Sequence, residues 1–365
     1  MKKRILVINT VPTDKNGITN VIFSYYCPIL TDSYILDYVS INEVDDYYQN
    51  KIKNSGGVCY VLPRQAGSIA HYFCELFRII SSRRYDAVHI HGNSHTVLIE
   101  LYAAFLAKCK VRIVHAHATS SKYPLFHHIL SPLFHCVCNK RLACSEYAGK
   151  WMYGKRHFIV IRNGVDTKRF AFNHENRNKI REKIGWQNKV VLSHVGDFSA
   201  NKNQIFLIDV LKRLNKDGNI YGLVLIGEGE LKQVVNEKVN QEGLEQCVLF
   251  TGKISDVERY LSGTDCILLP SFHEGLPLSL VEQQANGLRC IISDSITREA
   301  NITGNITYLP LDFNEWANVI GRISIDNKND REIRSKQSIK QLQTAGYDVR
   351  ASAIFLKQFY SSNIL

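Results

Sequence analysis

The sequence has no long apolar run and no paired-cysteine motif. No apolar stretch approaches the roughly 20 residues that a membrane-spanning helix needs, and the charged start Lys2–Arg4 leads only into ILVINTV. That stretch is typical of a first strand rather than a signal peptide, so we expect a cytoplasmic protein. The ten cysteines include no CxxC pair and no recognised zinc spacing, which argues against a disulfide framework or a structural zinc site.

Acidic residues are scarce in the first half of the chain. Residues 1–165 hold 20 Lys and Arg against 10 Asp and Glu, whereas residues 166–365 hold 25 against 24, for a net charge of +11. The first half is therefore expected to face something anionic: lipid headgroups, a diphosphate-linked acceptor or nucleic acid. A basic nucleic-acid-binding protein is one alternative. We expect no nucleic-acid partner, because the aromatic residues follow helix and strand patterns and no known nucleic-acid module is present.

Short β-rich runs alternate with longer amphipathic stretches, a pattern that predicts an α/β fold with parallel sheets. The runs expected to form strands are residues 5–9, 87–91, 111–116, 141–145, 158–163, 190–196, 223–227, 248–252, 266–270 and 290–293. A length of 365 residues with 45% apolar content exceeds what one core usually organises. The polar turn around Asn163-Gly164 marks a linker. We therefore expect two Rossmann-like, doubly wound domains facing a central cleft, at residues 1–165 and 166–345. A terminal helix within 346–365 either packs back on the first domain or is a plain terminal helix.

The most specific pattern is HEGLPLSLVEQQANG at residues 273–287, directly after the apolar run CILLP. It contains two carboxylates, Glu274 before a predicted helix and Glu282 inside it. Between them, the backbone N–H groups of Gly275, Leu276 and Leu278 lie near a helix start, which favours phosphate binding. The alternative is a capped helix with two exposed glutamates. The position at the carboxyl end of a strand favours a ligand site.

This E-x7-E pattern resembles the signature of retaining family-4 glycosyltransferases of the GT-B fold. Three further segments resemble motifs of that family in the expected order: IRNGVDTKRF (161–170), VGDFSANKNQIFLI (195–208) and LIGEGEL (225–231). The similarity extends over nearly the whole chain and is greatest to transferases of capsule, exopolysaccharide and O-antigen gene clusters. The fold that the resemblance implies agrees with the two-domain α/β prediction.

The resemblance also implies roles for individual residues. Glu274 would hold the hydroxyls of the donor sugar, Glu282 the nucleotide ribose and Lys202 the diphosphate. One position departs from the family pattern, because Asp197 stands where an arginine is common. The remaining donor-binding positions lie in loops or at the helix start: Gly17, Gly227, Gly275, Leu276 and Leu278. In the first domain, His117 corresponds to a histidine that contacts the transferred sugar, while His115 is less securely aligned.

The implied reaction moves a hexose, with retention, from a nucleotide sugar to a growing glycan or lipid-diphosphate acceptor. UDP is the commonest carrier in the family. No cofactor is expected, and the absence of a D-x-D motif at a strand end fits a site that works without metal. A nucleotide-sugar 2-epimerase or a glycogen-type phosphorylase on the same scaffold is the alternative. The NGVD linker combined with E-x7-E favours a transferase.

The segment 121–141 bears on where the protein works. Phe126, Leu130, Leu133 and Phe134 recur at helical spacing. This apolar face either packs on the protein's own sheet or rests on a membrane, together with the basic residues Arg78, Arg83 and Arg84. The second interpretation predicts peripheral binding to the anionic inner face of the plasma membrane.

Overall fold

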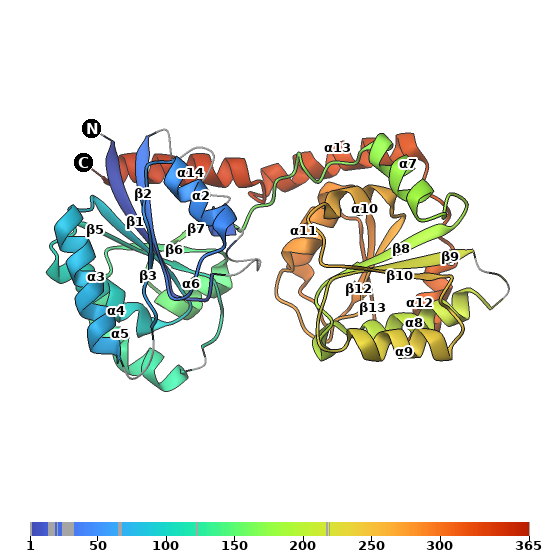
Figure 1. Ribbon diagram of the computed structural model, residues 1–365, viewed down its shortest axis with the longest axis horizontal. Helices are drawn as coiled ribbons and strands as arrows, with labels where there is room; N and C mark the ends of the chain where they lie inside the picture. Colours follow the sequence, from blue (N-terminus) through green and yellow to red (C-terminus); the bar gives the residue numbers. More distant parts are fainter. Residues whose placement is uncertain are drawn as a thin grey trace. The chain divides into compact units, whose positions relative to one another are not determined.

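A computed structural model describes residues 2–13, 19, 21–23, 33–64, 68–121, 123–216, 218 and 220–364. The chain forms two compact units. Unit 1 contains residues up to Gly164 and the returning segment Val349–Leu365, and unit 2 is Val165–Asp348. Each unit has one parallel sheet with helices on both faces (Figure 1). The prediction of two doubly wound α/β domains is confirmed.

Unit 1 has a seven-stranded sheet in the order β3-β2-β1-β4-β5-β6-β7. Its strands are β1 (Lys3–Asn9), β2 (Tyr34–Ser40), β3 (Cys59–Val61), β4 (Ala87–Gly92), β5 (Val111–Ala116), β6 (Lys140–Ala143) and β7 (Ile159–Val160). Its helices include α2 (Asp46–Asn54), α3 (Ile69–Arg83), α4 (Leu98–Leu106), α5 (Pro124–Val137), α6 (Glu146–Tyr153) and α14 (Val349–Asn363). The helix α14 belongs to this unit although it follows all of unit 2 in the chain.

Alternation along β4 explains how the two faces of this sheet differ. Val88 and Ile90 point into a core that includes Leu76 of α3 and Leu101 of α4. His89 points to the opposite face, where its Nδ1 lies 2.6 Å from the hydroxyl of Tyr360 in α14. Successive side chains of a strand face opposite ways, so the two odd-numbered histidines of β4 share the α14 side of the sheet.

Unit 2 has a six-stranded sheet in the order β10-β9-β8-β11-β12-β13. Its strands are β8 (Val190–Val195), β9 (Tyr221–Ile226), β10 (Val248–Gly252), β11 (Cys266–Leu269), β12 (Arg289–Ser293) and β13 (Ile306–Leu309). Its helices include α7 (His174–Lys183), α8 (Gln204–Leu214), α9 (Lys232–Gln241), α10 (Val257–Gly263), α11 (Leu278–Ala285), α12 (Phe313–Ile320) and α13 (Lys328–Thr344). Continuous apolar strands fit burial on both faces.

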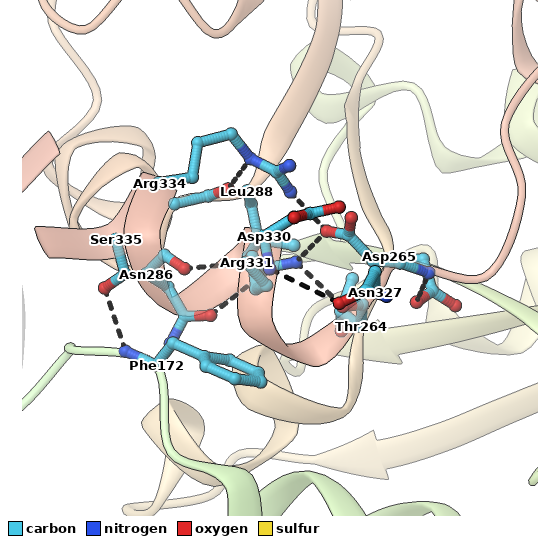
Figure 2. A network of polar contacts seen from close by, with 12 residues as sticks. Phe172, Thr264, Asp265, Asn286, Leu288, Asn327, Asp330, Arg331, Arg334 and Ser335 are labelled. Carbon is cyan, nitrogen blue, oxygen red and sulfur yellow. Dashed lines mark hydrogen bonds and ion pairs between the residues drawn. The ribbon is translucent and has the colours of Figure 1, made fainter. Parts of the chain in front are cut away.

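A buried polar network holds α7 and α13 to the start of β11, and Figure 2 shows its part around Arg331 of α13. The fully buried carboxylate of Asp265 accepts hydrogen bonds from Arg177 at 2.7 Å and Arg181 at 2.9 Å, both on α7. Arg331 of α13, also fully buried, donates to the backbone and side-chain oxygens of Asn286 at 2.7 and 2.6 Å. Buried charges are tolerated here because each has partners of opposite charge or carbonyl oxygens.

Candidate active site

In the sheet of unit 2, the direction in which successive strands are added changes between the neighbouring strands β8 and β11. The chain runs outward through β9 and β10, then returns to build β11, β12 and β13 on the other side of β8. In open parallel sheets, ligands bind outside the carboxyl ends of the strands at such a switch point. The loop after β8 carries Lys202, and the loop after β11 carries Glu274. Two of the predicted site residues therefore lie at the position that the topology favours.

The structure brings these two residues into direct contact. The ammonium of Lys202 lies 2.5 Å from Glu274 Oε1, and both side chains are only 15% exposed. Asn201 ties the same two loops together, because its side chain donates to the carbonyl of His273 at 2.8 Å and accepts from the N–H of His273 at 3.0 Å. The sequence predicts separate roles for Lys202 and Glu274. Without a ligand, each is the other's partner.

The glycine loop after β9 lies against the loop after β8. Gly227 has φ 147°, and a Cβ at this position would come within 1.9 Å of the carbonyl oxygen of Gly196. Only glycine allows this approach. The predicted Gly227 thus shapes the site through backbone packing. Asp197, in the same pair of loops, is exposed at its side chain, while its carbonyl oxygen accepts a hydrogen bond from Gln204 at 2.7 Å.

The helix α11 starts beside Glu274. Pro277 is its N-cap residue and Leu278 its first residue. Among the described residues, no carbonyl of a turn or loop accepts a hydrogen bond from the N–H of Gly275, Leu276 or Leu278. These amides and the positive end of the helix dipole are therefore open to an anion.

Glu282 lies one turn further along α11. Burial raises the pKa of its carboxyl group to about 7, with Arg169 acting in the opposite direction and Glu258 adding to the rise. Arg169 itself forms an ion pair with Glu258 at 2.9 Å. Glu282 forms no hydrogen bond or ion pair with Lys202 or Glu274, so the structure does not join the two predicted glutamates. A carboxyl group with a pKa near 7 can both accept and donate hydrogen bonds to hydroxyl groups.

Four histidines gather in unit 1 at the carboxyl ends of β4 and β5. His91 is the register partner of His115, and His91 Nδ1 lies 2.8 Å from Nε2 of the predicted His117. The ring of His89 stacks on His91 with centroids 4.5 Å apart. We did not predict His89 and His91 from the sequence. The sequence pattern that indicates them is the pair HIH at 89–91 and HAH at 115–117. A period of two places the four histidine side chains on one face of neighbouring strands. The predicted Gly17 lies outside the described residues.

This histidine cluster is neutral at pH 7. Burial, followed by repulsion from neighbouring histidines, lowers the pKa of His89, His91 and His115 well below the ordinary value. Burial lowers the pKa of His117 to about 4. Ligand nitrogens of His89, His91 and His115 lie within 4.8 Å of one another, so these three could hold a transition-metal ion. Two of the rings already use a nitrogen within the fold, His89 toward Tyr360 and His91 toward His117.

The cluster predicts acid destabilisation of unit 1. In the unfolded chain the histidines bind protons near pH 6.5, whereas in the folded chain they remain neutral. Their contribution is complete above pH 6.5 and is lost as the pH falls toward the lower folded values. Each buried histidine then costs about 2 kcal/mol at pH 5. Chemical denaturation between pH 7.5 and 5 should show a smaller pH dependence for His115→Gln. The control His71→Gln removes an exposed histidine and should match the wild type; equal curves for all three proteins would contradict the prediction.

Residues 176–337 match the family model described as glycosyl transferases group 1. EpsF of Bacillus subtilis (strain 168), named as a glycosyltransferase, is 29% identical over 381 residues, covering 99% of this chain and 97% of its own. The UDP-Gal:alpha-D-GlcNAc-diphosphoundecaprenol alpha-1,3-galactosyltransferase of Escherichia coli is 30% identical over 246 residues, covering 63% of this chain and 61% of its own.

Solved structures share the fold over nearly the full length. Alr3699/HepE of Anabaena, crystallised with UDP, has a TM-score of 0.79 at 18% identity, covering 99% of this chain and 100% of its own. The lipopolysaccharide glycosyltransferase WaaG has a TM-score of 0.67 at 12% identity, covering 96% and 99%. The matched family region contains both Lys202 and Glu274. Residues 176–337 therefore form a glycosyl transferases group 1 domain, and the chain is a glycosyltransferase with the GT-B fold.

Proposed function

We propose that this glycosyltransferase moves a sugar, with retention, from a UDP-linked donor to a growing lipid-linked surface polysaccharide. The observation that carries the proposal is the Lys202–Glu274 pair at the switch point of unit 2, beside amides at the start of α11 that donate to no loop carbonyl in the described part of the chain. Two relatives support the choice of substrates: the Escherichia coli enzyme is named for UDP-Gal and a diphosphoundecaprenol acceptor, and HepE was crystallised with UDP-glucose.

The pair suggests how a donor binds. The donor's diphosphate replaces the Glu274 carboxylate as the anionic partner of Lys202. The amides of Gly275 and Leu276 add hydrogen-bond donors at the positive end of a helix. Glu274 is then released from its ion pair and can accept hydrogen bonds from the sugar hydroxyls. Glu282 takes the ribose hydroxyls. His117 in unit 1 remains a predicted contact of the transferred sugar.

Replacing Lys202 by alanine should weaken nucleotide-sugar binding by about 10- to 100-fold, the scale of a charge-assisted hydrogen bond. Isothermal titration with UDP-glucose measures the effect. Lys212→Ala is the matched control, because Lys212 forms an exposed ion pair with Glu242 elsewhere in unit 2. An unchanged dissociation constant in the Lys202 variant would remove this residue from the donor site.

The reaction itself is tested with a panel of nucleotide sugars and a lipid-diphosphate acceptor, followed by mass spectrometry of the product. Transfer should require the acceptor and proceed in EDTA. A 2-epimerase would instead change the sugar nucleotide without any acceptor. Loss of transfer in EDTA, with recovery on adding Mg²⁺ or Mn²⁺, would contradict the metal-free mechanism.

The surface of α5 supports a membrane-bound location. Leu125, Phe126 and Ile129 are 68%, 55% and 61% exposed. The four residues predicted to form one face are divided: Phe126 and Leu133 are exposed, whereas Leu130 is partly buried and Phe134 fully buried in the core. Helix α5 continues through Pro132. Exposed apolar side chains gathered on one helix are typical of an interaction surface. No helix among the described residues combines the length and apolar character of a membrane span.

We expect the protein to co-sediment with vesicles of anionic lipid at low salt and to dissociate as salt rises. The double variant Leu125→Ser/Ile129→Ser should bind several-fold less, because its apolar contact with the bilayer is lost. Val234→Ser, which alters an exposed apolar residue of α9 in unit 2, is the control. Equal binding to neutral and anionic vesicles, or none to either, would defeat the proposal.

A further inference from the structure

Unit 1 has a cavity of about 750 Å³ at the amino ends of β4, β5 and β6. The segments that enter these strands line it, namely Arg84–Asp86, Lys108–Lys110 and Lys140, and so does Ile364. The histidine cluster lies at the opposite, carboxyl ends of the same strands. A six-residue strand spans about 20 Å, so the cavity is separate from that cluster. Its volume is in the range of small-molecule sites.

Four cationic side chains line this cavity: Arg84, Lys108, Lys110 and Lys140. Within the described ranges, none of their charged groups forms a hydrogen bond or ion pair, in contrast to Arg83 next to them, which bonds Asp37. The acid lining the cavity, Asp86, already accepts a hydrogen bond from the N–H of Arg4 at 2.8 Å and pairs with Lys3 at 3.6 Å. No acidic side chain that lines the cavity therefore neutralises the charge of these four cations.

The backbone presents two of these cations at positive φ. Arg84, at the end of α3, has φ 50°, and Lys108, after α4, has φ 58°. They are two of three non-glycine residues with positive φ in the described chain. Both residues end a helix in the αL conformation, which is a common way for helices to terminate. The two helix ends offer about half a negative charge each, too little to balance four cations.

We propose that this cavity binds the phosphate group of a phosphorylated amphiphile. A guanidinium and several ammonium groups suit the oxygens of a phosphate, and several cations favour an anion of more than one charge. Ile80, Leu106 and Val111 provide apolar walls for the rest of the ligand. The phosphate is either the headgroup of an anionic lipid or part of a free metabolite, and the same residues hold it in both cases.

The test uses the full chain and a pocket variant, Lys108→Gln/Lys110→Gln. The control Lys150→Gln/Lys155→Gln removes the same charge from exposed positions of unit 1 that do not line the cavity. One arm titrates inorganic pyrophosphate by calorimetry in a Lys202→Ala background, which disables the proposed diphosphate site of unit 2. The other arm compares sedimentation with phosphatidylglycerol and phosphatidylcholine vesicles. Thermal unfolding verifies that all variants are folded.

A free phosphate ligand predicts pyrophosphate binding that weakens at least ten-fold in the pocket variant and is unchanged in the control. A lipid headgroup predicts the same pattern for phosphatidylglycerol vesicles, with little pyrophosphate binding. If the pocket and control variants lose binding equally, or if neither ligand responds to the pocket variant, the proposal is wrong.

Discussion

The Glu274→Ala variant is expected to lose glycosyl transfer by on the order of 10³-fold while it unfolds at nearly the same temperature as the wild type. The carboxylate lies in a loop before α11 and contacts Lys202 and Asn201 rather than the apolar core. In the proposed mechanism it holds the donor sugar in its reactive position, and losses of this scale follow removal of one group that stabilises a transition state. Product formation under single-turnover conditions measures the effect.

The Lys202–Glu274 pair adds a second readout for this variant. Removing the carboxylate frees the ammonium of Lys202, so UDP should bind at least as tightly as it does to the wild type although transfer is lost. Glu242→Ala, which breaks the exposed ion pair with Lys212, is the control and should retain full turnover. Wild-type turnover by a folded Glu274→Ala protein would refute the role of Glu274.

The largest effect on stability is expected for Asp265→Ala. Burial alone would raise the pKa of this carboxyl group, but Arg177 and Arg181 outweigh it and hold the pKa below its ordinary value. The carboxylate also accepts from the N–H of Val191 at 2.8 Å and of Asp326 at 3.0 Å. Its loss leaves two buried guanidinium groups without a counter-ion, and breaking a buried pair costs about 3 to 5 kcal/mol.

Denaturant unfolding of the full chain should therefore show a destabilised transition for unit 2 in the Asp265→Ala variant. Asp209→Ala provides the comparison, because Asp209 pairs with Lys238 on the surface of the same unit at 2.6 Å. A surface pair contributes at most about 1 kcal/mol. Equal destabilisation by the two substitutions would mean that the buried network does not stabilise unit 2.

The sequence predicts those strands of this fold that are continuously apolar. Strand β2 is not predicted, because a charged residue interrupts its apolar run. The charged residue in β2, YILDYVS, is Asp37. Its burial is possible because its carboxylate accepts hydrogen bonds from Arg4 at 2.8 Å and from the hydroxyl of Tyr85 at 2.5 Å, and neither partner can be inferred from the strand's own sequence. The short strands β3 and β13 were missed as well. Their three- and four-residue lengths give too little pattern to identify.

For the candidate site, individual residues could be predicted from the sequence, but the contacts between them could not. The family resemblance predicts Lys202 and Glu274 individually, but their contact depends on β8 and β11 being neighbours in the sheet. Strand order is a property of the whole unit and has no local trace in the sequence. The histidine cluster required the register of β4 with β5, and the cationic cavity required three strand starts to meet.

The late return of the chain to unit 1 has a consequence for its synthesis. Tyr360 of α14 is fully buried and contacts His89, and Ser361 contacts Tyr34, so the first sheet lacks one of its covering helices until residues after Val349 leave the ribosome. Translation of the intervening residues 165–348 takes on the order of 10 s or more. Unit 2 is a single continuous segment that is complete before α14 emerges, so it can fold before unit 1 is complete. Until α14 emerges, the histidine-bearing face of the first sheet lacks the helix that contacts His89, and unit 1 reaches its final packing only after unit 2 has been synthesised.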